Sequence, residues 1–152
     1  MAVNPIPKGY HAVTPYLIIR GAASAIEFYR KAFNAAELMR FAGPDGKIMH
    51  AEIKIGDSQI MLADEMPDVG YVGPQSLNGT TVGFHIYVQN VDQWFTRALA
   101  AGAKELRPVQ DQFYGDRSGT LLDPYGHMWT IATHVEDVGT EELRRRAEAS
   151  MS

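Results

Sequence analysis

The sequence contains no cysteine. Disulfide bridges and thiolate-bound metal sites are therefore excluded. No apolar run approaches the roughly 20 residues that a membrane-spanning helix needs. The first ten residues lack the charged-then-apolar pattern of a secretory signal. We therefore expect a cytoplasmic protein without a membrane partner.

No basic block stands out in the sequence either. Lys and Arg number 14 against 18 Asp and Glu, which gives a formal net charge of −4. This balance argues against a nucleic-acid partner. The segment GDRSG at 115–119 has neither the spacing nor the following helix of a phosphate-binding loop. Ser118 is not in the sequence context of a hydrolase nucleophile.

What the chain does contain is two similar series of secondary-structure patterns. The first half predicts a strand, a helix and three more strands, at 13–20, 22–34, 37–41, 47–55 and 59–63. Pro15 places the first strand at a sheet edge or a bulge. The helix has an apolar stripe formed by Ala22, Ile26, Tyr29 and Phe33. In the strand at 47–55, alternation predicts one buried face formed by Met49, Ala51, Ile53 and Ile55.

The second half predicts the same order of elements, at 81–88, 91–101, 104–108, 120–122 and 127–133. Asn90 and Gln93 form a capping pattern at the start of its helix. Residues 64–80 and 110–117 are rich in glycine, proline or polar residues and predict a linker and a loop. A short terminal helix is expected from Thr140.

Equivalent positions in the two halves lie 69 residues apart, as for Thr14 and Gly83 or Gly21 and Asn90. We therefore predict an α+β fold of two tandem βαβββ modules whose curved mixed sheets surround a cleft. The expected ranges are 12–64 for module one, 65–80 for the linker, 81–134 for module two and 135–152 for the tail. The first three ranges together, 12–134, would form one domain.

Three runs carry a resemblance to a known family: AIEFYRKAF at 25–33, VQNVDQWFTRALAAGA at 88–103 and DPYGHMWTIATH at 123–134. They resemble the glyoxalase/bleomycin resistance/dioxygenase superfamily, whose fold is called vicinal oxygen chelate. GDRSGTLLDPYGHMW at 115–129 and ATHVEDV at 132–138 resemble its PhnB-like branch. The resemblance covers residues 12–134. It implies a glyoxalase-like fold, a small-molecule ligand and a homodimer.

Metalloenzymes of this superfamily carry a ligand on the first and last strand of each half. Carried over onto this sequence, the four positions are Thr14, Met61, Gly83 and Thr130. None is a strong ligand for a divalent ion. We therefore expect no metal and no other cofactor, unless the strand registers are wrong. In that case His50, Glu52 and His85 would form a different site of two histidines and one carboxylate.

The candidate ligand-binding residues are those expected to face the cleft or the loop beside it. They are Thr14, Tyr16, His50, Glu52, Met61, His85, Tyr87, Tyr114, Arg117 and Thr130. Arg117 is expected either to bind an anionic ligand or to pair with Asp116 or Asp123.

Three functions remain open. The first is a non-catalytic binder of a small cationic or aromatic molecule. The second is a metal-dependent lyase, isomerase or dioxygenase, which rests on the likeness of fold alone. The third is a metal-free enzyme with Glu52 or a histidine as general base.

Overall fold

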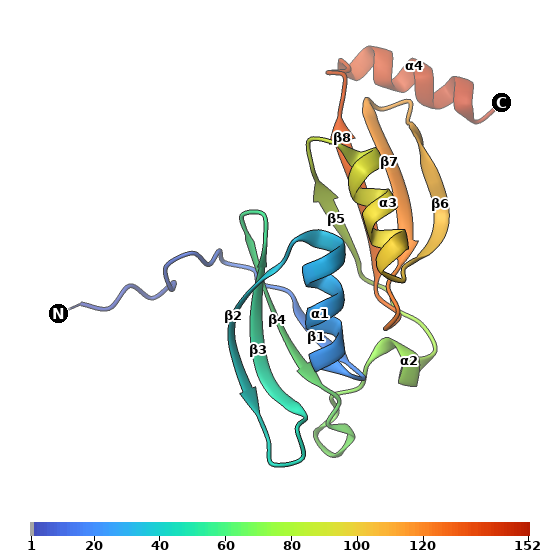
Figure 1. The fold of residues 1–152 in the computed structure, drawn as a ribbon. Helices are drawn as coiled ribbons and strands as arrows, with labels where there is room; N and C mark the ends of the chain where they lie inside the picture. Colours follow the sequence, from blue (N-terminus) through green and yellow to red (C-terminus); the bar gives the residue numbers. More distant parts are fainter. Residues whose placement is uncertain (1) are drawn as a thin grey trace. The chain divides into compact units, whose positions relative to one another are not determined.

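The structure is a computed structural model that describes residues 2–152. The chain divides into two compact units, one ending at Thr80 and one spanning Thr81–Ser152. Each unit has the order βαβββ (Figure 1). The α+β prediction of two tandem βαβββ modules is therefore confirmed. Among residues 2–152, no helix has the length and apolar character needed to cross a membrane.

The first unit contains a four-stranded mixed sheet with the strand order β1-β4-β3-β2. Strand β1 lies parallel to β4 at one edge, and the other pairs are antiparallel. The bounds are β1 Tyr16–Ile19, α1 Ala22–Phe33, β2 Ala36–Ala42, β3 Ile48–Ile55 and β4 Ser58–Asp64. Pro15 immediately precedes β1, and β1 is an edge strand of this sheet. The edge position expected from Pro15 is therefore confirmed.

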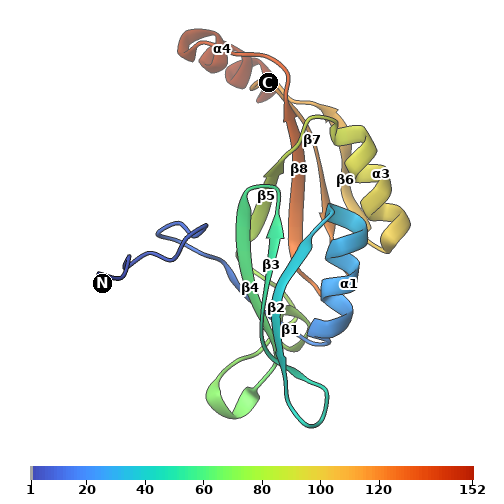
Figure 2. The ribbon, with the colours of Figure 1, turned by 60° about the vertical axis from the view of Figure 1, so that its left-hand side comes forward.

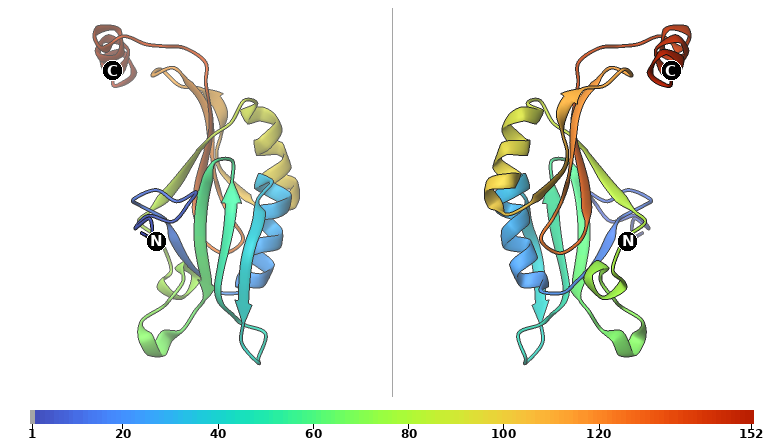
Figure 3. Two further views of the ribbon diagram at one scale, coloured as in Figure 1. Left: turned by 90° about the vertical axis from the view of Figure 1, so that its left-hand side faces the viewer. Right: turned by 90° about the vertical axis from the view of Figure 1, so that its right-hand side faces the viewer.

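Helix α1 covers one face of this sheet. It buries Ala22, Ile26, Tyr29 and Phe33, the stripe that the sequence predicts. The segment before β1 lies on the other side of the sheet in each of the turned views (Figures 2 and 3). We call the face of the sheet away from α1 the open face, because its residues Tyr16, His50 and Glu52 are exposed or half-buried.

The second unit repeats this plan with the strand order β5-β8-β7-β6. The bounds are β5 Gly83–Tyr87, α3 Val91–Ala101, β6 Lys104–Asp111, β7 Asp116–Leu122, β8 Met128–His134 and α4 Thr140–Ser150. Helix α3 packs closely on β7, since a Cβ atom at Gly119 would lie 2.8 Å from the Phe95 ring. Asn90 caps α3 by accepting a hydrogen bond from the Gln93 N–H at 3.1 Å, as predicted.

The last strand of each βαβββ series anchors the start of its helix. In the first unit the buried Asp64 carboxylate accepts hydrogen bonds from the N–H groups of Gly21, Ala22 and Ile48, at 2.9, 3.0 and 2.7 Å. In the second unit the Thr133 hydroxyl accepts from the Val91 N–H at 2.9 Å. Asp64 and Thr133 are 69 residues apart, so the repeat extends to this contact.

A bulge changes the predicted face of β3. Phe41 pairs with His50 and Ala42 pairs with Ile48, which leaves Met49 without a partner on β2. Ile48 is consequently buried, and Met49 is 57% exposed. The prediction that Met49 shares the buried face was wrong, while Ala51, Ile53 and Ile55 are buried as expected.

Two predicted connections contain more structure than the sequence indicated. The loop expected at 110–117 is shorter than predicted and spans residues 112–115, because β6 runs to Asp111 and β7 begins at Asp116. The segment predicted as a linker contains the short helices η1 Pro67–Val69 and α2 Pro74–Leu77. The terminal helix expected from Thr140 is present as α4.

The substitution Asp64→Ala should lower the free energy of unfolding by about 2–4 kcal/mol, since it removes the partner of three N–H groups. Urea unfolding followed by circular dichroism measures the change. Asp57→Ala, in the exposed hairpin turn, is the matched control and should stay within about 0.5 kcal/mol of wild type. Equal stability of the two variants would show that Asp64 does not anchor α1.

Candidate functional site

The open face of the first sheet carries a cluster of four hydrogen-bonded side chains, Tyr10, Tyr16, His50 and Glu52, which we call the Glu52 cluster. His50 and Glu52 are two residues apart on β3, and alternation directs both away from the buried Ala51. Tyr16 comes from edge strand β1, and Tyr10 comes from the segment before it.

The contacts form one chain. The Tyr10 hydroxyl donates to Glu52 Oε2. His50 Nε2 lies 3.1 Å from Glu52 Oε1, and His50 Nδ1 lies 2.9 Å from the Tyr16 hydroxyl. If Nε2 carries the proton and donates to the carboxylate, Nδ1 is free to accept from Tyr16. Both ring nitrogens of His50 and both oxygens of Glu52 are therefore engaged.

Hydrogen bonding and burial set the charge state of this cluster. The hydrogen bond from Tyr10 lowers the pKa of Glu52 against the opposing effect of burial, and the hydrogen bond from His50 adds to the lowering. Burial, together with the hydrogen bond to Glu52, raises the pKa of Tyr10 to about 12. Burial also raises the pKa of Tyr16. At neutral pH the cluster is thus one carboxylate with two neutral phenols.

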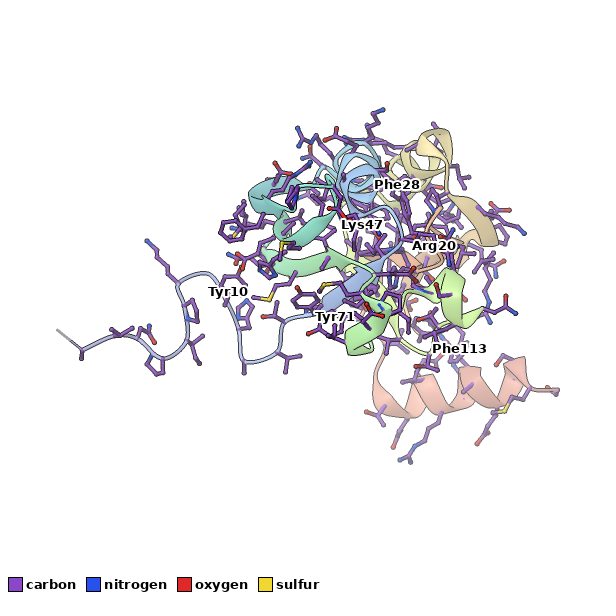
Figure 4. All side chains as sticks on the ribbon, turned by 90° about the horizontal axis from the view of Figure 1, so that it is seen from below. Tyr10, Arg20, Phe28, Lys47, Tyr71 and Phe113 are labelled. Carbon is purple, nitrogen blue, oxygen red and sulfur yellow. The ribbon has the colours of Figure 1, made fainter. Side chains whose placement is uncertain are left out.

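One methionine and two further aromatic side chains lie next to members of the Glu52 cluster. Met61 is the cross-strand neighbour of both Tyr16 and Glu52, and Phe41 is the neighbour of His50. The Tyr16 ring also contacts the Tyr71 ring at a centroid distance of 6.4 Å. Phe41 is 60% exposed, and Tyr71 is 43% exposed. In Figure 4 the labelled Tyr10 and Tyr71 lie on one side of the sheet and Phe28 of α1 lies on the other.

The open face of the second sheet carries different groups. His85 is the cross-strand neighbour of Thr130, whose hydroxyl lies 2.9 Å from the hydroxyl of Thr120. The rings of His85 and Tyr87 are in contact at 4.8 Å. Both side chains are exposed.

Tyr87 connects this face to a buried carboxylate, Asp116, which is 4% exposed. The Tyr87 hydroxyl donates to Asp116 Oδ2 at 2.8 Å, and His134 Nδ1 lies 2.8 Å from Asp116 Oδ1. His134 Nε2 in turn lies 2.7 Å from Asp137. Burial acts to raise the pKa of Asp116, but the hydrogen bonds from His134 and Tyr87 outweigh it and lower the pKa.

The comparison with known families decides where this fold belongs. The family model "Glyoxalase/Bleomycin resistance protein/Dioxygenase superfamily" matches residues 10–131. The chain belongs to this superfamily. The resemblance noted from the sequence is thereby confirmed.

Individual relatives extend this result. The chain is 44% identical over 147 residues to the uncharacterized protein Mb0911c of Mycobacterium bovis, covering 95% of this chain and 94% of that protein. The crystal structure of TioX from Micromonospora sp. ML1 is similar with a TM-score of 0.65 at 27% identity, covering 82% and 99% of the two chains. A PhnB protein from Bacillus cereus shares the fold, with a TM-score of 0.65 at 19% identity and coverage of 81% and 99%.

The superfamily raises the question of a metal. Met61 has Tyr16 and Glu52 as cross-strand neighbours, and Thr130 has His85 and Thr120, so the strand pairing brings one carboxylate and one imidazole next to the expected positions. The expected positions themselves, Thr14, Met61, Gly83 and Thr130, supply neither group. These residues do not fit a divalent ion. In residues 2–152 no group of three or more His, Asp or Glu side chains is arranged to hold one. The alternative set of His50, Glu52 and His85 is divided between the two units and stays a prediction.

The other predicted site residues take varied positions. Thr14 is half-buried just before β1. Tyr114 lies in the loop between β6 and β7, with its ring in edge contact with Phe113. Arg117 projects from the α3 side of its sheet and pairs with Asp92 at 2.9 Å and Asp111 at 3.2 Å. The expectation that Arg117 pairs with Asp116 or Asp123 was wrong, because the alternation along β7 directs Asp116 to the opposite face.

Sequence reasoning missed Tyr10, Asp116 and His134 as parts of these clusters. Tyr10 lies in a proline- and glycine-rich segment without periodicity, so the sequence carried no signal for it. Asp116 and His134 are cross-strand partners, and only the correct extent of β7 and β8 brings them together. The sequence signal that could have indicated this pair is an aspartate at the start of one strand and a histidine at the end of the next strand.

His134 makes the stability of the second unit depend on pH. Hydrogen bonds to Asp116 and then Asp137 raise the pKa of His134 above its ordinary value of 6.5. The stabilisation is therefore complete below pH 6.5 and is lost as the pH rises through the folded-state pKa. Between pH 6 and 9, wild type should lose more stability than His134→Gln, as measured by urea midpoints.

The control for this comparison is His11→Gln, which lies in the exposed segment before β1. It should keep the pH dependence of wild type. Parallel curves for wild type and His134→Gln would contradict the assignment.

Proposed function

We propose that this protein is a small-molecule-binding member of the superfamily that uses the open sheet faces and needs no metal ion. The observation that carries the proposal is the ionised carboxylate of the Glu52 cluster, which shares its face of the sheet with the exposed rings of Tyr16, Phe41 and Tyr71. The homodimer that the family resemblance implies and the cytoplasmic location expected from the sequence are parts of this proposal.

The ligand class follows from the chemistry of the face. Glu52 supplies a negative charge at neutral pH, because its pKa is lowered. Phe41 and Tyr71 supply exposed ring surfaces, which attract both flat aromatic groups and cations. The net charge of −4 also favours a cation over an anion. We therefore propose an aromatic or cationic organic ligand.

Two enzymatic alternatives have less support. A metal-dependent lyase, isomerase or dioxygenase needs ligands that Thr14, Met61, Gly83 and Thr130 do not supply. A metal-free enzyme with Glu52 as general base needs a carboxylate whose pKa lies near the working pH. The lowered pKa of Glu52 acts against that role.

A screen of fluorescent aromatic cations, such as acriflavine, ethidium and berberine, tests the proposal. A compound that binds wild type should bind Glu52→Gln about tenfold more weakly or worse, because the variant loses one charged interaction. Fluorescence anisotropy measures both dissociation constants.

Glu105→Gln is the matched control, because Glu105 is an exposed carboxylate on β6. It should bind like wild type. Equal affinity of wild type and Glu52→Gln for every compound that binds would refute the assignment of the ligand to the Glu52 cluster.

A further inference from the structure

The segment before β1 meets the first sheet at one place. Every residue from Ala2 to Gly9 is exposed, and so are residues 11–13, but Tyr10 is half-buried. Figure 4 shows Tyr10 where this segment comes to the sheet. The segment therefore has a single side-chain anchor in an otherwise exposed stretch.

Gly9 allows this close approach. Its φ of +87° lies in the left-handed region that favours glycine. A Cβ atom at this position would lie 2.5 Å from Gln59 Nε2, so any larger residue would displace the segment or the Gln59 side chain. A turn in which the Tyr10 N–H donates to the Pro7 carbonyl at 3.0 Å then directs the chain at the sheet.

The phenol of Tyr10 contacts Glu52 on β3, and Gln59 of the neighbouring β4 lies close to both. The Tyr10 hydroxyl donates to Glu52 Oε2. Gln59 lies diagonally across from Glu52 on the same face, since Glu52 pairs with Met61 and Lys54 pairs with Gln59. The Oε1 atom of Gln59 is buried and, among residues 2–152, is the one buried side-chain polar atom found without a hydrogen-bond partner. An acceptor in that state is a place where a bound donor gains stability.

We infer that this part of the first sheet is a subsite for an aromatic hydroxyl group, which the chain fills with its own Tyr10. This inference rests on the proposed function and gives its ligand a second feature, a phenol beside the aromatic or cationic part. The ligand's hydroxyl donates to Glu52 in place of Tyr10, and the segment leaves the sheet when the ligand binds.

Displacing the segment requires little free energy, because few contacts hold it on the sheet. Tyr10 is the one half-buried residue between Ala2 and Val13. A ligand that replaces its ring and its hydrogen bond therefore restores both contacts. Beyond these two contacts, ligand binding has to supply only the small free energy needed to detach a short exposed segment from the sheet.

The experiment supplies the side chain of tyrosine as a separate molecule. Tyr10→Ala vacates the subsite in a segment that contributes little to the core, so the fold should persist. Binding of 4-methylphenol to 15N-labelled protein is followed through the amide signals of Glu52 and Gln59. Tyr10→Ala should bind 4-methylphenol at least about tenfold more tightly than wild type, in which Tyr10 competes.

Two comparisons isolate the hydroxyl group. Toluene, which has the ring without the hydroxyl, should bind Tyr10→Ala about tenfold more weakly than 4-methylphenol does. The double variant Tyr10→Ala/Glu52→Gln should likewise bind 4-methylphenol about tenfold more weakly than Tyr10→Ala. Equal binding to wild type and Tyr10→Ala, or equal binding of toluene and 4-methylphenol, would overturn the inference.

A second measurement follows the segment itself. Trypsin cleaves after Lys8, and we expect this cleavage to be faster when Tyr10, two residues further on, is released from the sheet. Tyr10→Phe, which loses only the hydroxyl, should be cut at Lys8 several-fold faster than wild type, whereas Val3→Ala should be cut at the wild-type rate. An unchanged rate for Tyr10→Phe would show that the bond to Glu52 does not hold the segment.

The outcome of these tests is independent of the outcome of the test of the proposed function. 4-Methylphenol carries no charge and reports on the subsite alone. If aromatic cations bind through Glu52 but 4-methylphenol does not distinguish the variants, the proposed function stands and the phenol subsite is wrong.

Discussion

In each unit a single helix of the βαβββ series packs against the four-stranded sheet, and this constraint shapes both units. A sheet needs cover for its apolar face, and α1 or α3 covers one face only. In the first sheet the other face carries polar and aromatic side chains together with Met61. On β3 this division follows the alternation of the strand, with Ala51 and Ile53 under α1 and His50 and Glu52 opposite. The candidate site exists because this second face has no helix.

The anchoring of the helices fixes which face is closed. Asp64 holds the start of α1 from the end of β4, and Thr133 holds the start of α3 from the end of β8. A helix fixed at its first turn cannot move to the other side of its sheet. The same contact at positions 69 residues apart shows that the repeat is a structural one, although few side chains are shared.

The two units share one arrangement of strands but carry different side chains at equivalent positions. Tyr16 pairs with Met61 in the first sheet, and His85 pairs with Thr130 at the equivalent place in the second. The first face gains an ionised carboxylate among aromatic rings, and the second gains two hydroxyls beside an exposed histidine. This difference between the two faces is consistent with the proposed recognition of an organic ligand.

The sequence predicted what depends on local periodicity and turn chemistry. The stripe of α1, the cap at Asn90 and the buried Ala51 and Ile53 all follow from spacing within one element. The exposure of Met49 depends on a bulge, which is a property of the pairing between β2 and β3. The ends of β6 and β7 likewise depend on cross-strand contacts, which sequence periodicity does not contain.

The candidate site was predicted in part for the same reason. His50 and Glu52 share a face by alternation, and the structure joins them by a hydrogen bond. Arg117 was placed with Asp116 or Asp123 because the extent of β7 was not known. Tyr10 reaches Glu52 through a turn in a segment that precedes every strand, and no local pattern specifies where such a segment lies.

Bound metal per chain is the measurement that tests the central claim most directly. The protein is purified without chelators, and its metal content is measured by mass spectrometry before and after incubation with Zn, Ni, Mn and Fe(II). Recognition without a metal ion predicts no stoichiometric metal and no thermal stabilisation by any of these ions. Near-stoichiometric metal that is lost on His50→Ala or His85→Ala would contradict it.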